Sequence, residues 1–238
     1  MADELRVVEV RDERSEVAKA AIELIHVSIG DVQPTADLLS ELEECRLGLP
    51  SGGDYHLLAA LDEAGEPMAA AAGVYLEGVN AGFITYLAVR KEMRNRQLGR
   101  ELRAHLLRCF HDDALEARGE ALAWTVGEVR RESAWLRTLV QGGQAITFDL
   151  GYFHPWMPLR AEGRYVLYRE PAADTRAEIP SHEVARLLFA IWRRAYRIRY
   201  PLQSETFCYM LRGLEGRDGI GPDPGFTSSA AESPAGLG

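Results

Sequence analysis

The chain has 238 residues, of which 47% are hydrophobic and 26% are charged, and its formal net charge is −9. This composition excludes a collagen-like, coiled-coil or mainly disordered chain, and the length fits one domain with an appendage or two small domains. The negative charge argues against nucleic-acid binding over the whole surface, which requires a broad positive face.

The sequence also argues against membrane insertion and export. No apolar run approaches the roughly 18 residues that span a bilayer, and the acidic N-terminus MADELRVVEVRDER resembles neither a signal peptide nor a transit peptide. Cys45, Cys109 and Cys208 are far apart, show no metal-ligand spacing, and sit in apolar contexts typical of a protein core. We therefore expect a cytoplasmic protein that holds no metal.

The first half of the chain changes its hydrophobic period several times. β-Branched residues predict a strand over 5–10, and apolar spacing then predicts two amphipathic helices over 17–28 and 35–45. Period-two segments and turns follow, and they predict an antiparallel meander of three strands. These strands cover residues 55–61, 68–78 and 83–89. The alanine run within 68–78 is too short between its turns for a comfortable helix.

The second half begins with the clearest helix, from Leu98 to about Asp112, because leucines recur on one face. A strand over 121–129 and a helix ending at Gly142 follow. Two closing strands are predicted at 145–153 and 164–169. The expected fold class is α/β, with a mixed, mostly antiparallel central sheet and flanking helices, over a domain at residues 1–170.

The C-terminal part differs in composition. Residues 171–180 predict a linker, and residues 181–215 predict a helical hairpin whose helices are capped by Ser181 and Ser204. Gly, Pro, Ala and Ser dominate residues 216–238, which we expect to be disordered. Short amphipathic helices are unstable alone in water, so the hairpin should pack near the acceptor side of the domain or on a second copy in a homodimer. Its apolar stripes contain Leu187, Leu188, Ile191, Trp192, Phe207 and Met210.

One segment combines a strand end, a polar loop and a helix start. Residues 90–103 hold six cations (Arg90, Lys91, Arg94, Arg96, Arg100 and Arg103) and two acids, a local charge of +4 in an acidic protein. The first turn of a helix has free backbone N–H groups and a partial positive charge, so phosphate oxygens bind there. A solvated basic face is the plainer interpretation of arginines on a helix, but the strand and loop before the helix favour a polyanion site.

The same segment resembles the acetyl-CoA-binding motif of the GCN5-related N-acetyltransferase (GNAT) superfamily, in which Arg/Gln-x-x-Gly-x-Gly/Ala follows a strand and opens a helix. In Arg94-Asn95-Arg96-Gln97-Leu98-Gly99 the first and last positions match, whereas Gln97 stands where the family usually has glycine. The order of elements over about 165 residues is also similar to the family's fold.

The resemblance implies direct acetyl transfer from acetyl-CoA to an amine of a small molecule or protein. The pantetheine chain would pair with the strand at Leu87, Ala88 and Val89. The phosphates would bind the loop from Arg94 to Arg100. In members of the family, the CoA phosphates bind a loop whose residues are equivalent here to Arg94, Asn95, Arg96, Gln97, Leu98, Gly99 and Arg100.

The residues that would move protons are less clear from the sequence. Glu128 ends a strand near the expected cleft and is our candidate base, and Tyr152 is our candidate acid or acceptor-pocket residue. The tyrosine that many family members use is replaced at the approximate equivalent by Thr138. His154 and His56 are alternative bases, Thr85 and Tyr86 are not competent bases at neutral pH, and catalysis by water and positioning alone stays open.

Two other functions remain open. Gln97 and Thr138 depart from the family pattern, which would also fit a CoA-binding module that has lost turnover. The arginines at 186, 193, 194, 197 and 199 could bind nucleic acid, although a solvated or docked basic face is the favoured interpretation.

Overall fold

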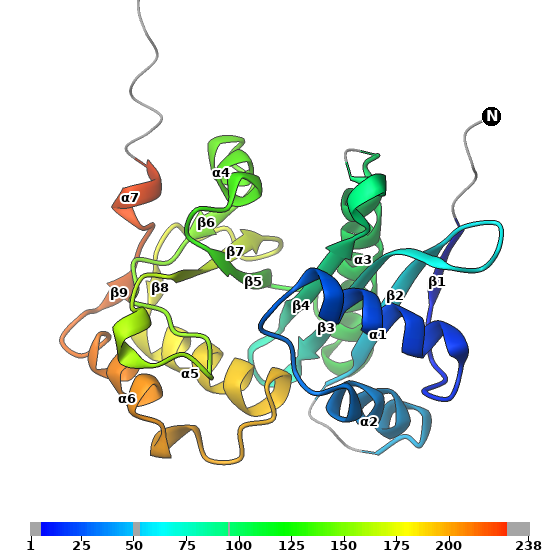
Figure 1. Cartoon of the computed structure of the whole chain (residues 1–238). Helices are drawn as coiled ribbons and strands as arrows, with labels where there is room; N and C mark the ends of the chain where they lie inside the picture. The colour runs from blue at the N-terminus through cyan, green and yellow to red at the C-terminus, as the bar shows by residue number, and fades with distance from the viewer. Residues whose placement is uncertain (1–5, 50–52, 95, 228–238) are drawn as a thin grey trace, which may run out of the picture. The chain divides into compact units, whose positions relative to one another are not determined.

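The computed structural model describes residues 6–49, 53–94 and 96–227 (Figure 1). These residues form two compact units. The first contains residues up to 122 together with 194–196, and the second contains residues 123–193 and those from 197 on. The boundary at residue 122 falls inside the range expected as one domain, 1–170, and the expected linker at 171–180 lies within the second unit.

The first unit is built on the antiparallel meander β1-β2-β3-β4. Its strands are β1 (Arg6–Glu9), β2 (Tyr55–Leu61), β3 (Pro67–Leu76) and β4 (Ala81–Val89). Its helices are α1 (Glu16–Ser28), α2 (Thr35–Arg46) and α3 (Leu98–Arg118), with single 3₁₀ turns η1 (Glu77–Val79) and η2 (Lys91–Met93). The strand, the two helices and the meander predicted from the sequence are confirmed.

The alanine run explains how this unit packs. Residues 69–72 are fully buried in β3, and both α1 and α3 contact that strand. Small side chains allow helices to pack closely on the sheet. A strand that is covered on both faces is apolar along its length and does not alternate apolar with polar residues. α3 extends past the expected end at Asp112 because Ala114 continues its buried stripe, which contains Leu98, Leu102, Leu106, Phe110 and Ala114.

The second unit has its own antiparallel strands in the order β5-β7-β6. These are β5 (Trp124–Arg130), β6 (Ile146–Thr147) and β7 (Tyr165–Pro171), and β8 (Ile179–Pro180) pairs with β9 (Gly219–Ile220). The helices are α4 (Ala134–Gln141), α5 (Ser181–Ala190), α6 (Glu205–Arg212) and α7 (Pro224–Thr227), with a π-helical turn η4 (Ile191–Ala195) and 3₁₀ turns η3 (Leu159–Ala161) and η5 (Pro201–Gln203).

Two expectations for this unit need correction. The strand expected over 145–153 contains only the two residues of β6, after which Phe148 makes an isolated bridge with Pro222. Ser204 caps α6 by accepting from the Phe207 N–H, as expected, but Ser181 is the first residue of α5 and its hydroxyl instead donates to the Arg217 carbonyl.

The segment after 215 also differs from the expectation of disorder. Residues 216–227 contain β9 and α7, and residues 228–238 lie outside the described residues. Ile220 pairs with Ile179 across β8 and β9, Phe226 is buried, and Asp223 accepts from the Arg131 guanidinium. These contacts tie the glycine-rich segment to the rest of the second unit.

The apolar stripes of the C-terminal helices are buried within this one chain. All six stripe residues are at most 1% exposed, and the Trp192 and Phe207 rings lie 4.9 Å apart. None of the helices in the described ranges is long and apolar enough to cross a lipid bilayer.

Candidate active site

The end of β4 and the start of α3 bring the expected donor-binding residues together in the first unit. Ala88 is buried, and Leu87 and Val89 are half-buried against the cluster that α3 completes. A Cβ atom added at Gly99 would lie 3.5 Å from Cγ2 of Val89, which is ordinary van der Waals contact. The strand end therefore lies directly beside the first turn of α3.

The residue before α3 has an unusual backbone conformation. Gln97 has a φ of 62° and a ψ of 2°, in the left-handed region that glycine adopts without steric cost. The loop therefore has this conformation with a side chain in place. The side chain of Gln97, the N-cap residue, makes no capping hydrogen bond to the first turn of α3, and the backbone N–H groups of a helix start are directed toward the residues before it.

The cations of this segment do not all play the same part. Lys91, Arg94, Arg96 and Arg100 are exposed, as a polyanion site requires. Arg90 instead donates through Nε to the Pro67 carbonyl at 2.8 Å, which fixes it against the β3 entry. Arg103 is half-buried, and Asn95 lies outside the described residues. Four exposed cations around a helix start suit a diphosphate.

The two candidate catalytic residues lie together in the second unit. Glu128 comes from β5 and Tyr152 from the loop after β6, and the same loop adds His154. Oε1 of Glu128 lies 3.4 Å from Nε2 of His154, and their side chains are only 6% and 3% exposed. Rings of Trp156 and Tyr165 flank the imidazole at 5.0 and 5.7 Å.

The Glu128 carboxylate also affects the ionisation of Tyr152. Its side chain is fully buried, and burial together with the nearby Glu128 carboxylate raises its pKa well above the ordinary value for tyrosine. The phenol therefore stays protonated at any ordinary pH. The sequence suggested Glu128, Tyr152 and His154 one at a time, and the structure places them in one cluster.

The other residues considered from the sequence are engaged elsewhere. Thr138 is exposed on α4, and its hydroxyl donates to the Ala134 carbonyl one turn earlier. The Tyr86 hydroxyl accepts from the Gln33 backbone N–H at 3.0 Å. Thr85 is half-buried on β4.

His56 belongs to a cluster that the sequence did not predict. Its Nδ1 lies 2.8 Å from Oε1 of Glu9, and its Nε2 lies 2.8 Å from Oδ2 of Asp113. Burial lowers the pKa of His56, but hydrogen bonds with Asp113, Cys109 and Glu9 outweigh burial and raise it to about 12, so His56 is an imidazolium at neutral pH. The two carboxylates are 47 and 57 residues away in the chain, so no local pattern could have revealed them.

Comparison with known proteins adds a family assignment. Residues 25–134 match the family model described as the Acetyltransferase (GNAT) family. The chain thus carries a GNAT acetyltransferase domain, and the resemblance seen at Arg94 and Gly99 is confirmed. Members of this family are N-acetyltransferases, which confirms the expected enzyme class. No curated protein matches the chain at a significant level.

A solved structure with a TM-score above 0.5 supports the fold class, and two others with lower scores are also similar. A protein from Acinetobacter baylyi ADP1 assigned as an acetyltransferase is 14% identical, with a TM-score of 0.51, over 73% of this chain and 96% of that one. The ribosomal-protein-S18-alanine N-acetyltransferase from Escherichia coli is 15% identical, with a TM-score of 0.48, over 72% and 99%. The NatC complex bound to a Gag peptide and CoA matches at 15% identity and a TM-score of 0.49, over 71% and 99%. The mixed, mostly antiparallel sheet with flanking helices is confirmed.

Proposed function

We propose that this chain uses acetyl-CoA to acetylate an amine of a small molecule or protein. The observation that carries the proposal is the start of α3, where a first turn that its N-cap residue Gln97 does not cap and four exposed cations follow directly on β4 within the family-matched segment. Backbone N–H groups and arginines would hold the diphosphate of CoA, and the edge of β4 at Leu87 to Val89 would bind the pantetheine amides.

The acceptor must lose a proton before it can attack the thioester. A lysine-like amine with a pKa near 10.4 is almost fully protonated at pH 7, which costs about 4 to 5 kcal/mol. In this proposal Glu128 accepts that proton, directly or through water, and its contact with His154 orients the carboxylate. The acetyl C–S bond breaks as the new C–N bond forms, and CoA leaves as a thiolate.

Tyr152 is proposed to protonate that thiolate or to line the acceptor pocket. Its protonated state at ordinary pH is the state that a proton donor needs. Tyr152→Phe separates the two roles, because loss of a donor lowers kcat, whereas loss of a pocket contact raises KM.

Calorimetry with acetyl-CoA and a thiol-release assay test the donor site. Arg94→Glu reverses a charge beside the phosphates and Gly99→Asp places a carboxylate against the first turn of α3, so each should weaken acetyl-CoA binding at least tenfold. Arg108→Glu is the matched control, since Arg108 is also exposed on α3 but lies more than two turns away. Gln97→Gly should preserve or tighten binding because glycine adopts the required φ freely. Unchanged affinity in folded Arg94→Glu and Gly99→Asp would contradict the proposal.

The acceptor is best identified by mass spectrometry of acetylated products after incubation with acetyl-CoA and a cell extract. An acidic protein would steer a cationic acceptor toward itself.

The three cysteines are free thiols in the structure, consistent with a reducing, cytoplasmic setting. Tight acetyl-CoA binding without any acetylated product would instead favour a binding module that lacks turnover.

A further inference from the structure

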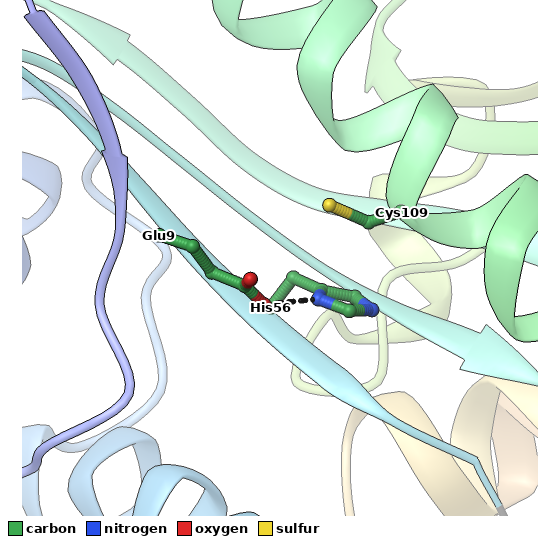
Figure 2. A group of neighbouring side chains, drawn as sticks. All are labelled: Glu9, His56 and Cys109. Atoms are coloured by element: carbon green, nitrogen blue, oxygen red, sulfur yellow. Dashed lines mark hydrogen bonds and ion pairs between the residues drawn. The ribbon is translucent and has the colours of Figure 1, made fainter.

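A second group of reactive side chains lies in the first unit, outside the residues that the proposed reaction uses. Glu9 comes from β1, His56 from β2 and Cys109 from α3, and Figure 2 shows them turned toward one another. A carboxylate oxygen, an imidazole nitrogen and the thiol sulfur all lie within 4.8 Å of one another. Cys109 is about three helical turns from the start of α3.

We propose that Glu9, His56 and Cys109 bind a Zn²⁺ ion or a similar borderline-soft divalent cation, with water as the fourth ligand. Thiolate, imidazole and carboxylate are the protein ligands of zinc, and three of them plus water complete a tetrahedron. This differs from the expectation of no metal drawn from the sequence, because each ligand comes from a different element and spacing along the chain cannot reveal the group.

The distances are close to those that a tetrahedral ion requires. Bonds of about 2.0 to 2.3 Å to zinc place neighbouring donor atoms roughly 3.3 to 3.6 Å apart. Oε1 of Glu9 and Nδ1 of His56 are 2.8 Å apart, so they need only separate by about half an ångström. The Glu9 side chain is 26% exposed, so it can make that movement and leave a coordination position for water.

Asp113 supplies the outer support that metal-binding histidines usually have. Its Oδ2 lies 2.8 Å from Nε2 of His56, on the side of the ring away from Glu9. Asp113 follows Cys109 by one turn of α3, so both side chains face the same strand. A carboxylate on Nε2 keeps the proton there and leaves Nδ1 as the nitrogen that meets the ion.

The charges balance before and after the ion binds. Arg11 donates to Oε2 of Glu9 at 2.8 Å and does not occupy Oε1. Without metal, two carboxylates face the imidazolium and the guanidinium. On binding, one proton leaves Nδ1 of His56 and one leaves Sγ of Cys109, while a dication enters, so the net charge of the group stays at zero. No electron is transferred, and the two protons pass to solvent.

The test uses the full chain, freed of metal with a chelator and then titrated with Co²⁺ and with Zn²⁺. One Co²⁺ per chain should give a thiolate-to-metal charge-transfer band and the visible absorption of a four-coordinate ion, and Zn²⁺ should displace it. Cys109→Ser should abolish the thiolate band and weaken Zn²⁺ binding at least tenfold. Asp113→Asn should weaken Zn²⁺ binding about 10- to 100-fold.

Cys45→Ser and Cys208→Ser are matched controls, because both thiols are half-buried and lie outside the cluster. Both variants should keep the band and the affinity. Should Cys109→Ser not fold, protection of the Cys109 thiol from alkylation by Zn²⁺ in the wild-type chain, with Cys208 unprotected, provides the same information by peptide mass spectrometry. A wild-type chain without the band in excess Co²⁺, a band that persists in Cys109→Ser, or equal alkylation of both thiols would overturn the proposal.

Discussion

Glu128 is the side chain on which the proposed proton transfer depends most. Its carboxylate is almost buried, contacts His154, and influences Tyr152. Glu128→Gln keeps the shape and removes the base, so turnover at neutral pH should fall by about 10² or more. The loss should shrink as the pH approaches the amine pKa, because the acceptor then loses its proton unaided.

Steady-state rates from pH 6 to 10 check this, with Glu132→Gln as the control. Glu132 is exposed just beyond β5, so its neutral variant should keep the wild-type rate. A loss of less than threefold in Glu128→Gln would favour catalysis by water and positioning alone.

The imidazolium of His56 should make folding stability depend on pH. Its pKa is raised to about 12, so its stabilisation is complete below the unfolded value near 6.5 and declines as the pH rises toward 12. Glu9 acts in the opposite range, since its pKa is lowered from 4.5 to about 2, chiefly by the hydrogen bond from His56, and its stabilisation is lost as the pH falls below 4.5. Together they place the most stable range of this cluster between about pH 4.5 and 6.5.

Urea unfolding in a chelator at pH 6, 7.5 and 9 tests this expectation. The free energy of unfolding of the wild type should fall faster with pH than that of His56→Gln, by up to about 1.4 kcal/mol per pH unit, the value for one proton. Burial raises the pKa of Asp113, so this carboxyl also binds its proton more tightly in the folded chain, and its contribution to the pH dependence has the same sign as that of His56. Parallel pH profiles for the two proteins would show that His56 is neutral in the folded chain.

At the scale of elements, α3 packs closely on the sheet because Gly82 has no side chain where Phe110 lies. A Cβ atom added at Gly82 would lie 2.0 Å from Cδ2 of Phe110, and Phe110 is fully buried. Gly82→Ala therefore forces the ring or the strand to move and should cost about 1 to 3 kcal/mol of unfolding free energy. Gly78→Ala is the control, because nothing lies within 4 Å of its added Cβ. Equal thermal midpoints for the two variants would contradict this packing.

The sequence predicts helices and strands well where one hydrophobic period continues over enough residues. The leucines of α3 and the strand patterns of β2 to β4 identified the meander and the helix that follows it. β6, β8 and β9 have two residues each, too few to show a period, and their pairing depends on partners far along the chain. The same limit applies to the sites: Glu128 and Tyr152 could be proposed from strand ends, whereas the contacts of His56 with Glu9 and Asp113 are tertiary.

At the scale of the whole molecule, three residues from the C-terminal part complete the first unit. Nη1 of Arg194 donates to Glu41 at 2.8 and 3.0 Å, and Nη2 donates to the Gly53 carbonyl at 2.7 Å. The next two residues add a hydrogen bond from the Gln33 side chain to the Ala195 carbonyl and an edge contact of the Tyr196 ring with Phe83 at 5.8 Å. One arginine of the basic C-terminal cluster thus docks on an acidic residue of α2, as one of our interpretations expected.

This ion pair should govern the stability of the first unit. The Glu41 and Arg194 side chains are 3% and 10% exposed, so removing the cation leaves the buried carboxylate without its opposing charge. Arg194→Met should lower the free energy of unfolding by about 3 to 5 kcal/mol, and adding Glu41→Leu should restore most of that loss because two apolar side chains can pack where the pair stood. Arg193→Met, at the exposed neighbouring position, should cost less than about 1 kcal/mol. Urea unfolding of the wild type and of these three variants tests this expectation. Equal losses in Arg194→Met and Arg193→Met would show that the C-terminal segment does not support the first unit through this pair, and truncation after Pro171 should then leave that unit as stable as before.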